Sequence, residues 1–533
     1  MSRLGTNLSA VRAVARCLPR KPILIGVAAV IVAANLVVPS TSAVRTVPLT
    51  PAALDAWFDD VVRDAGIPGA AIVVVRDGRI VNDHGVGVAD DSGRPVTGQT
   101  PFVIGSLAKS LTALAVSQLA ERGLVDLDSP VRRYLPEFAV ADPAASDAIT
   151  VRQLLNQTSG FTGAAGTAPL SMPATTLQAQ VRALATARPA SAPGATFQYS
   201  NANYLVLGRL IEVVSGQPYE AYLQANVFGP LRMTHSSSVL ATAVSDGLGQ
   251  AHRLWFGLAD SHAPLFREDL APAGFVAASA DDLANVLIAE MNGGRFGATS
   301  VATPATIAAL WKGAAPAGPG GGYAMGWFDG SFEGERIVSH AGSTTDMASF
   351  QAVVPSQGLG VVVLFNAQSV LYEELHKPDS IGLAAVARLM GYEGPGTQAL
   401  FYPAFDLFVL LIVGVLVRNL VRTIRAPIVP TARRWRAIWP ATWWGRGMLV
   451  VRVYLDVFVP YVLLTQAPAL FGASWLVLVR IDLGLVIAAI ATLRLLDGAI
   501  RFGRTVRAVR VSGDVAVVTP VPSGAGLATR AER

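Results

Sequence analysis

The chain has 533 residues, of which 52% are hydrophobic and 15% are charged, so it is long enough for two domains and more apolar than a typical soluble protein. Its net charge of +5 is unevenly distributed: residues 43–397 hold 21 basic and 31 acidic residues (21 − 31 = −10), and the rest holds 21 basic and 6 acidic residues (21 − 6 = +15). The acidic centre excludes a nucleic-acid-binding protein, because the surplus arginines flank apolar runs instead of forming a basic face.

The N-terminus combines basic residues with an uncharged apolar run. Four basic residues between positions 12 and 21 precede residues 22–39, and small residues follow at 40–43. This order is typical of a signal peptide, and the run is also close to the length of an uncleaved anchor. Either alternative makes residues 1–43 an export segment. The only cysteine, Cys17, excludes an intrachain disulfide and a cysteine-based metal site.

The exported region begins with a helix and a hairpin. Residues 51–64 carry apolar side chains such as Leu54 and Phe58 at helical spacing, which predicts an amphipathic helix. Residues 70–76 and 79–88 then form two strand patterns joined at Asp77-Gly78, a strong hairpin signal.

A serine and a lysine three residues apart follow at the start of a helical pattern over residues 107–121. Gly105 forms a turn before Ser106, and Lys109 lies one helical turn further on. Positions i and i+3 share a helix face, so the lysine amine can reach the serine hydroxyl. A serine at a helix N-terminus also lies near backbone donors that favour developing negative charge. The apolar character of this helix indicates burial, and a buried lysine needs a partner or a purpose.

The middle of the chain is helical. Helical patterns cover residues 151–156, 204–214, 219–226 and 281–291. Tyr199-Ser200-Asn201 precedes the second of them. A tyrosine whose pKa is lowered by a neighbouring cation can act as a general base, and the Asn201 amide offers a donor and an acceptor to a substrate. The alternative is structural, with Tyr199 in a helix-entry turn and Asn201 as the helix cap.

The last part of the region returns to strands. Strand patterns cover residues 323–328, 336–340, 349–354 and 360–365, after a loop at 313–322 and before a helix at 381–390. His340-Ala341-Gly342-Ser343 ends the second of these strands. Gly342 lets the backbone pass close to a substrate, and the Ser343 amide can serve as an oxyanion donor.

Strands at both ends with helices between them predict an α/β (α+β) fold. We expect one antiparallel sheet built from both ends of the region, flanked by helices and interrupted by an inserted helical region.

Three apolar runs near the C-terminus approach the length that crosses a bilayer, namely 399–417, 448–465 and 475–496. Arginines fill the first connection and follow the last run. The positive-inside rule therefore predicts an extracytoplasmic domain at 44–398 and three transmembrane helices with a basic cytoplasmic connection at 399–511. Residues 512–533 are expected to form a disordered cytoplasmic tail. These expectations describe a multi-pass protein of the cell membrane.

The three motifs, in this order, make residues 51–392 similar to the serine β-lactamase-like family, which holds class C β-lactamases, DD-peptidases and related esterases. The resemblance implies a β-lactamase/DD-peptidase-like fold and a serine hydrolase that needs no cofactor or metal. It further implies roles for the motif residues. Ser106 attacks an acyl carbonyl, Lys109 and Tyr199 manage its proton, and His340 completes the catalytic set. The amides of Ser106 and Ser343 hold the oxyanion, while Asn201, Gly342 and Ser343 contact the substrate.

Three departures from the family pattern bear on the substrate. His340 stands where class C β-lactamases have lysine, which removes a permanent charge opposite a β-lactam carboxylate and is closer to the DD-peptidase and esterase branches. Residues 344–347 replace the commoner Thr-Pro-Gly turn. Gln157 stands where many relatives have histidine.

The sequence thus predicts a membrane-anchored extracytoplasmic serine hydrolase. Its expected substrate is a D-amino-acid peptide, an ester or a β-lactam type compound, with cell-wall material as a source. Two alternatives remain, a non-hydrolytic penicillin-binding sensor and a membrane scaffold. The short cytoplasmic segments argue against the sensor, and the three intact motifs argue against the scaffold. Neither the exact substrate nor an oligomeric state follows from the sequence.

Overall fold

The computed structural model describes residues 45–255, 258–318, 321–368 and 378–393, together with 414–415, 417–425, 492–493, 496–497 and 500. The chain divides into two compact units, Met1–Thr46 and Val47–Arg533. All features described below belong to the second unit.

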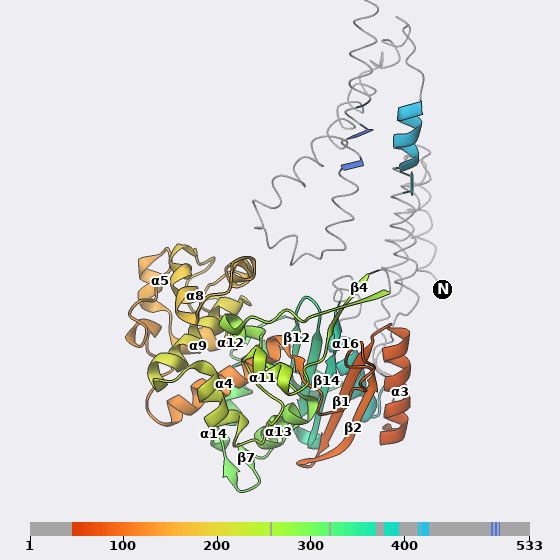
Figure 1. Cartoon of the computed structure of the whole chain (residues 1–533). Coiled ribbons are helices and arrows are strands. Elements are labelled where there is room, and N and C mark those ends of the chain that lie inside the picture. The colour runs from red at the N-terminus through yellow and green to blue at the C-terminus, as the bar shows by residue number, and fades with distance from the viewer. Residues whose placement is uncertain are drawn as a thin grey trace, which may run out of the picture. The chain divides into compact units, whose positions relative to one another are not determined.

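An eight-stranded antiparallel sheet combines strands from the two ends of the described domain (Figure 1). The strand order is β2-β1-β14-β13-β12-β11-β10-β9. The strands are β1 (Gly69–Arg76), β2 (Arg79–Gly87), β9 (Ala315–Pro316), β10 (Gly322–Tyr323), β11 (Phe328–Phe332), β12 (Glu335–Ser343), β13 (Ala348–Val354) and β14 (Leu359–Phe365). The first strand in the chain, β1, pairs directly with the late strand β14, in the register Ala70 opposite Phe365. The predicted sheet architecture is confirmed.

Helices cover both faces of the central strands, which explains why β14 is apolar at every position. Alternate residues of a strand point to opposite faces. Val361 and Val363 pack with α3 (Pro51–Asp64) and α16 (Pro378–Leu389), whereas Val362 and Leu364 belong to the core that contains α13 (Ala280–Met291). Burial on both faces removes the alternation of polar and apolar residues that marks a one-sided sheet.

The inserted region is built around two long helices, α4 (Ala108–Glu121) and α9 (Asn201–Ser215), which lie on the opposite side of the sheet from α3 (Figure 1). Every residue of α4 from Ala108 to Leu119 is buried. The shorter helices are α5 (Pro143–Ala148), α6 (Val151–Leu155), α7 (Gly163–Thr167), α8 (Leu177–Ala183), α10 (Tyr219–Leu223), α11 (Leu240–Ser245), α12 (Ala271–Gly274) and α14 (Pro304–Leu310). The remaining strands are β3 (Phe102–Val103), β4 (Ala251–Trp255), β5 (Leu258–His262), β6 (Ala277–Ala278), β7 (Arg295–Phe296), β8 (Thr299–Ser300) and β15 (Ala367–Gln368).

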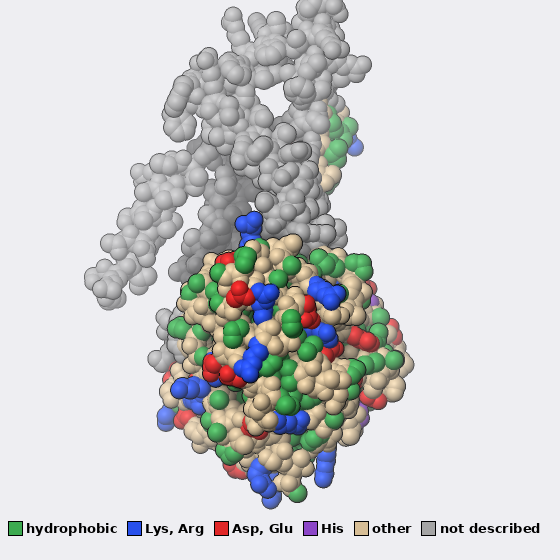
Figure 2. Space-filling view, turned by 90° about the vertical axis from the view of Figure 1, so that its left-hand side faces the viewer, with side chains coloured by type: hydrophobic (Ala, Val, Ile, Leu, Met, Phe, Trp, Pro, Cys, Tyr) green, Lys and Arg blue, Asp and Glu red, His purple; other side chains and the backbone are tan. Residues whose placement is uncertain are grey.

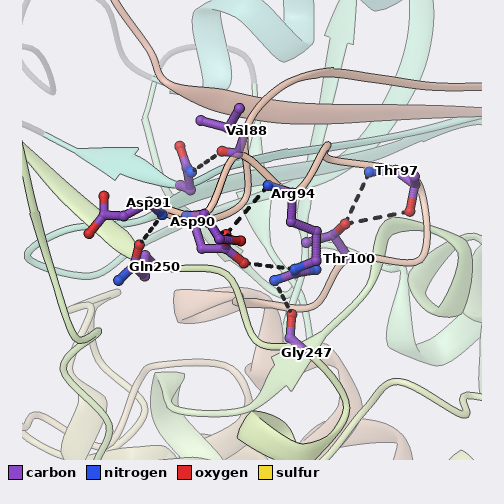
Figure 3. Close-up of polar contacts among 10 residues, drawn as sticks. Val88, Asp90, Asp91, Arg94, Thr97, Thr100, Gly247 and Gln250 are labelled. Atoms are coloured by element: carbon purple, nitrogen blue, oxygen red, sulfur yellow. Dashed lines mark hydrogen bonds and ion pairs between the residues drawn. The ribbon is translucent and has the colours of Figure 1, made fainter.

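The loop that follows β2 is tied by polar contacts to the segment before β4 (Figure 3). Arg94 forms an ion pair with Asp90, with 2.8 Å between Nε and Oδ2, and donates from its terminal nitrogen to the Gly247 carbonyl at 2.9 Å. The Asp91 amide donates to the Gln250 side chain at 2.6 Å. These contacts connect the edge of the large sheet to the inserted region.

Several predicted element bounds were wrong. Residues 323–328 do not form one strand, because β10 ends at Tyr323 and β11 begins at Phe328, with the Ala324 amide donating to the Trp327 carbonyl across the turn at 2.8 Å. The predicted loop at 313–322 contains β9. Asn201 is not a helix cap, since it is the first residue of α9 and Ser200 occupies the cap position.

The predicted membrane segments fall almost entirely outside the described residues. The run 399–417 is described only at 414, 415 and 417, the run 475–496 only at 492, 493 and 496, and the run 448–465 not at all. The export segment 1–43 and the tail 512–533 also lie outside. Within the described part of the chain, no helix has both the length and the apolar character needed to span a bilayer.

Candidate active site

Ser106 lies in a single 3-10 turn, Gly105–Leu107 (η1), that leads into α4. Ser106 is partly exposed, whereas every other residue from Pro101 to Ser110 is buried. Gly105 adopts a left-handed backbone conformation with φ of 54°, and a β-carbon there would lie 2.4 Å from the Ser343 amide nitrogen. Glycine is therefore required by both the turn and the close approach of β12.

Lys109 is fully buried directly beneath the serine. Its Nζ lies 2.9 Å from Ser106 Oγ and donates to the carbonyl oxygen of Ala273 on α12. Among the described residues, none of the ion pairs includes Lys109. Burial lowers the pKa of Lys109 well below its usual value, because an ammonium loses its hydration there without gaining a carboxylate partner. The amine is thus suited to accept the serine proton.

Tyr199 lies on the other side of the lysine, with its ring centre 5.0 Å from Lys109 Nζ. We predicted that a neighbouring cation lowers the pKa of Tyr199, and this was wrong. Burial raises its pKa well above the usual value, with the charge of Tyr323 adding to the rise, and a hydrogen bond with Ser106 opposes it only in part. The physical reason is that the burial that lowers the pKa of Lys109 also disfavours the ammonium that would have stabilised a charged Tyr199. The Tyr199 hydroxyl therefore holds its proton at neutral pH and is suited to donate it.

Gln157 holds the tyrosine motif in place, a role that sequence reasoning missed. It is buried, with a left-handed φ of 59°. Its side-chain oxygen accepts from the Ser200 amide at 2.9 Å and from the Asn203 side chain, and its carbonyl accepts from the Gln198 amide at 2.8 Å. The backbone on both sides of Tyr199 is thereby fixed. The only sequence signal was the departure from histidine at this position.

Asn201 follows in the first turn of α9 and is partly exposed. Its side-chain oxygen is buried and has no hydrogen-bond partner in the described structure. A buried acceptor without a partner is costly, which makes this atom available to a donor on a bound molecule.

The end of β12 passes across the N-terminus of α4. A β-carbon on Gly342 would lie 2.2 Å from the Ile104 carbonyl oxygen, so only glycine allows this approach. The Ser349 hydroxyl on β13 donates to the same carbonyl at 2.7 Å. The contact brings the backbone of Ser343 next to that of Ser106, as two converging amides require to stabilise an oxyanion.

His340 lies on β12 next to the tyrosine motif, with its ring 6.1 Å from that of Tyr199. Its Nδ1 donates to the Ala341 carbonyl at 2.6 Å, and its Nε2 lies 3.4 Å from the Tyr323 hydroxyl. Burial, with a smaller effect of Lys109, lowers the pKa of His340 to about 3. His340 is therefore an uncharged ring at neutral pH.

A buried carboxylate fixes the turn after β12. Asp346 accepts from the Thr344 hydroxyl at 2.7 Å, from the Leu265 amide at 3.0 Å and from His262 Nε2 at 3.2 Å. The hydrogen bond to Asp346 raises the pKa of His262. The sequence showed only that residues 344–347 depart from the family pattern, and the partner on β5 could not be identified because it is distant in the chain.

The structure thus brings Ser106, Lys109, Tyr199 and His340 together with the backbone of Gly342 and Ser343. Within the described residues, no cluster of three or more histidine, cysteine or acidic side chains could hold a metal ion. Basic and acidic side chains are interspersed over the face formed by the helical region (Figure 2), so that face has no single-sign surface.

Comparisons with known proteins find a family and several relatives. A family model described as Beta-lactamase matches residues 54–385. Protein flp of Staphylococcus aureus (strain COL) is 28% identical over 318 residues, which are 59% of this chain and 63% of that protein. The chain thus spans less than two thirds of the length of this relative. Esterase EstB of Burkholderia gladioli is 37% identical over 205 residues, or 36% of this chain and 52% of the esterase.

A solved structure has the same fold. The octameric penicillin-binding protein homologue from Pyrococcus abyssi aligns with a TM-score of 0.57 and 26% identity, covering 69% of this chain and 82% of that one. The family model covers more than half of the chain and includes Ser106, the tyrosine motif and the end of β12. The chain therefore belongs to the β-lactamase family.

Proposed function

We propose that this protein is a membrane-anchored extracytoplasmic hydrolase that acts through an acyl-enzyme on a D-amino-acid peptide, an ester or a β-lactam type substrate. The observation that carries the proposal is the fully buried amine of Lys109, 2.9 Å from Ser106 Oγ and without a counter-ion among the described ion pairs. An uncharged amine at hydrogen-bond distance from a partly exposed hydroxyl is the arrangement of a base and its nucleophile.

In acylation, Lys109, Ser106 and Tyr199 act one after another. Lys109 Nζ takes the proton of the Ser106 hydroxyl while Oγ attacks the acyl carbonyl carbon. The negative charge on the carbonyl oxygen is held by the amides of Ser106 and Ser343. Tyr199 then gives its proton to the leaving group and recovers one from the Lys109 ammonium, and the bond from the acyl carbon to the leaving group breaks.

Deacylation reverses the proton path. Water attacks the acyl carbon, and its proton passes through Tyr199 to Lys109. The Lys109 ammonium gives a proton to Ser106 Oγ as the bond from Oγ to the acyl carbon breaks, which restores the free hydroxyl. Asn201 contacts the acyl side chain through its unpaired oxygen. The neutral state of His340 favours ester substrates over β-lactams and over peptides ending in D-Ala-D-Ala, because the carboxylate of either would gain no ion pair from this side chain.

The test compares Ser106→Ala and Lys109→Ala with the full-length protein on p-nitrophenyl esters, a peptide ending in D-Ala-D-Ala and a chromogenic cephalosporin. Loss of a nucleophile or its base lowers kcat by about 10³-fold or more. Lys312→Ala is the matched control, because Lys312 is exposed. Activity on all three substrates that survives Ser106→Ala would refute the proposal. Stoichiometric labelling of Ser106 without turnover would favour a sensor.

The location is tested separately. The apolar runs and arginine distribution support residues 44–398 outside the cytoplasm and 399–511 in the membrane. Protease added to intact cells or spheroplasts should remove the hydrolase domain and leave the C-terminal segment protected. A domain that resists protease until the membrane is broken would contradict this orientation.

A further inference from the structure

Four aromatic side chains meet beside Tyr199. Phe197 precedes the tyrosine motif, Tyr323 ends β10, Phe328 begins β11 and His340 lies on β12. Tyr323 is buried behind the others, with ring distances of 5.5 Å to Phe197 and 4.9 Å to Phe328. We use the name aromatic wall for Phe197, Phe328 and His340.

The aromatic wall is continuous and reaches the solvent. Its rings lie 6.4 Å apart between Phe197 and Phe328 and 5.3 Å apart between Phe328 and His340. Both phenylalanines are partly exposed, although nearby apolar side chains such as Trp327 and Tyr323 are fully buried. Two partly exposed phenylalanines next to Tyr323 and His340 are suited to contact a bound molecule.

The proposed mechanism determines which part of the substrate lies against the aromatic wall. The leaving atom must receive the proton that Tyr199 donates, so the leaving group begins within hydrogen-bond reach of that hydroxyl. The rest of the leaving group then extends toward His340, whose ring is 6.1 Å from that of Tyr199. In the proposed mechanism the acyl side chain contacts the unpaired oxygen of Asn201.

We propose that the substrate has an uncharged, apolar leaving group that packs on the aromatic wall, the class represented by esters of aromatic alcohols. This inference rests on the hydrolase mechanism proposed above and deepens it by naming the substrate class. A free carboxylate at this position would lose its hydration against rings that offer no cation.

The charged side chains next to Phe328, Asp329 and its partner Arg336, lie on the other face of the strand from the aromatic wall. Asp329 follows Phe328 on β11, so its side chain points to the other face of the strand. It pairs there with Arg336, with 2.7 Å between Oδ1 and Nε. His340 is uncharged at neutral pH because burial lowers its pKa to about 3.

One feature favours the opposite substrate class, a leaving group that carries a carboxylate. It is the guanidinium of Arg253, at the other edge of the site. Arg253 on β4 is aligned with Gln368 on β15, which donates to Ser343 Oγ at 2.8 Å. The Nε of Arg253 is buried and has no hydrogen-bond partner in the described structure. A substrate that carried a carboxylate on its leaving group would use this cation, so the two possibilities predict opposite preferences.

The experiment uses the full-length protein and acetate esters that differ only in the alcohol: benzyl, 4-carbamoylbenzyl, 4-carboxybenzyl and methyl. The carbamoyl and carboxyl esters have nearly the same size, so their ratio isolates the charge. We expect kcat/KM for the 4-carboxybenzyl ester to be about 100-fold lower than for the 4-carbamoylbenzyl ester. The benzyl ester should exceed the methyl ester through a lower KM.

Substitutions then assign the preference to the wall. Phe328→Ala and Phe197→Ala should each lower the ratio of benzyl to methyl kcat/KM by about two- to tenfold, as expected for loss of one aromatic contact. Phe332→Ala, on the same strand but in contact with Tyr392, should leave that ratio unchanged. Because each variant serves as its own reference through the methyl ester, a general loss of folding does not imitate the result.

Two outcomes would overturn the inference. One is a preference for the 4-carboxybenzyl ester that Arg253→Gln abolishes. The other is a benzyl-to-methyl ratio that both wall substitutions leave intact. Failure of the hydrolase mechanism itself has a different signature, because then no ester, including the methyl ester, is hydrolysed in a manner that depends on Ser106.

Discussion

Burial of a single amine sets the chemistry at the scale of residues. Lys109 has no exposed surface and no counter-ion among the described ion pairs, so the protein stabilises the neutral form that a base needs. The same burial keeps Tyr199 protonated and His340 neutral. Burial thus disfavours charge on all three side chains.

The neutral amine predicts a specific pH dependence. The rate constant kcat/KM should rise with pH as Lys109 loses its proton and reach its plateau well below pH 10.5, because the pKa of Lys109 is lowered by burial. Lys109→Arg, which is charged at every accessible pH, should lose about 10²–10⁴-fold in kcat/KM. Lys312→Arg is the matched control. A rate that still rises steeply near pH 10 would show that the base is not a buried amine.

The positions of these residues were predictable, but their protonation states were not. The spacing of Ser106 and Lys109 and the buried character of α4 are local features of the sequence. The direction of the pKa shift of Tyr199 depends on burial by segments distant in the chain, which include Tyr323. For the same reason Gln157 and Ala273 could not be assigned a role from the sequence.

At the scale of elements, the contact between β12 and the N-terminus of α4 has the strictest geometry. Both segments require glycine at this contact, at Gly105 before α4 and at Gly342 on β12. Long elements such as α3 and β14 were predicted nearly to the residue because their periodicity or continuous apolar character is a local property. The short pairs, such as β3 with β6, consist of two residues each and depend on tertiary contacts. Hydrophobic pattern could not reveal them.

Gly342→Ala tests this contact. Its β-carbon would meet the Ile104 carbonyl at 2.2 Å, so either β12 or the turn at Ser106 must move. A displacement of about 1 Å at a reacting group costs roughly 10²-fold in rate. Gly330→Ala on the adjacent strand is the control, because its β-carbon would be 4.0 Å from the nearest atom, the Ile337 carbonyl oxygen. Equal esterase activity of the two variants would show that the close approach does not position the site.

At the scale of the whole molecule, stability depends on a buried acid that the proposed chemistry does not use. Glu290 on α13 is buried, and its Oε2 accepts from Trp311 Nε1 at 2.7 Å. Burial raises the pKa of Glu290 to about 8 from 4.5. Between these values the folded protein keeps the proton and the unfolded chain releases it, so the free energy of unfolding falls as pH rises.

Glu290→Gln should remove this loss, because glutamine keeps an oxygen for Trp311 and never ionises. The variant should gain on the order of 3–5 kcal/mol in free energy of unfolding at pH 8 relative to the wild type. At pH 4 both forms are neutral and should differ little. Denaturant unfolding at the two pH values measures this, and a variant that is less stable at pH 8 would contradict the expected ionisation.

The pairing of β1 with β14 has a consequence for the timing of activity during synthesis. A nascent chain that has emerged only as far as α9 already contains Ser106, Lys109 and Tyr199. It still lacks β12, which carries Ser343, and β14, which pairs with β1. In the proposed mechanism, such an intermediate has Ser106 but lacks the Ser343 amide, the second of the two oxyanion donors. In the proposed mechanism, hydrolysis therefore requires the final strands, and we expect a nascent chain that ends at α9 to be inactive.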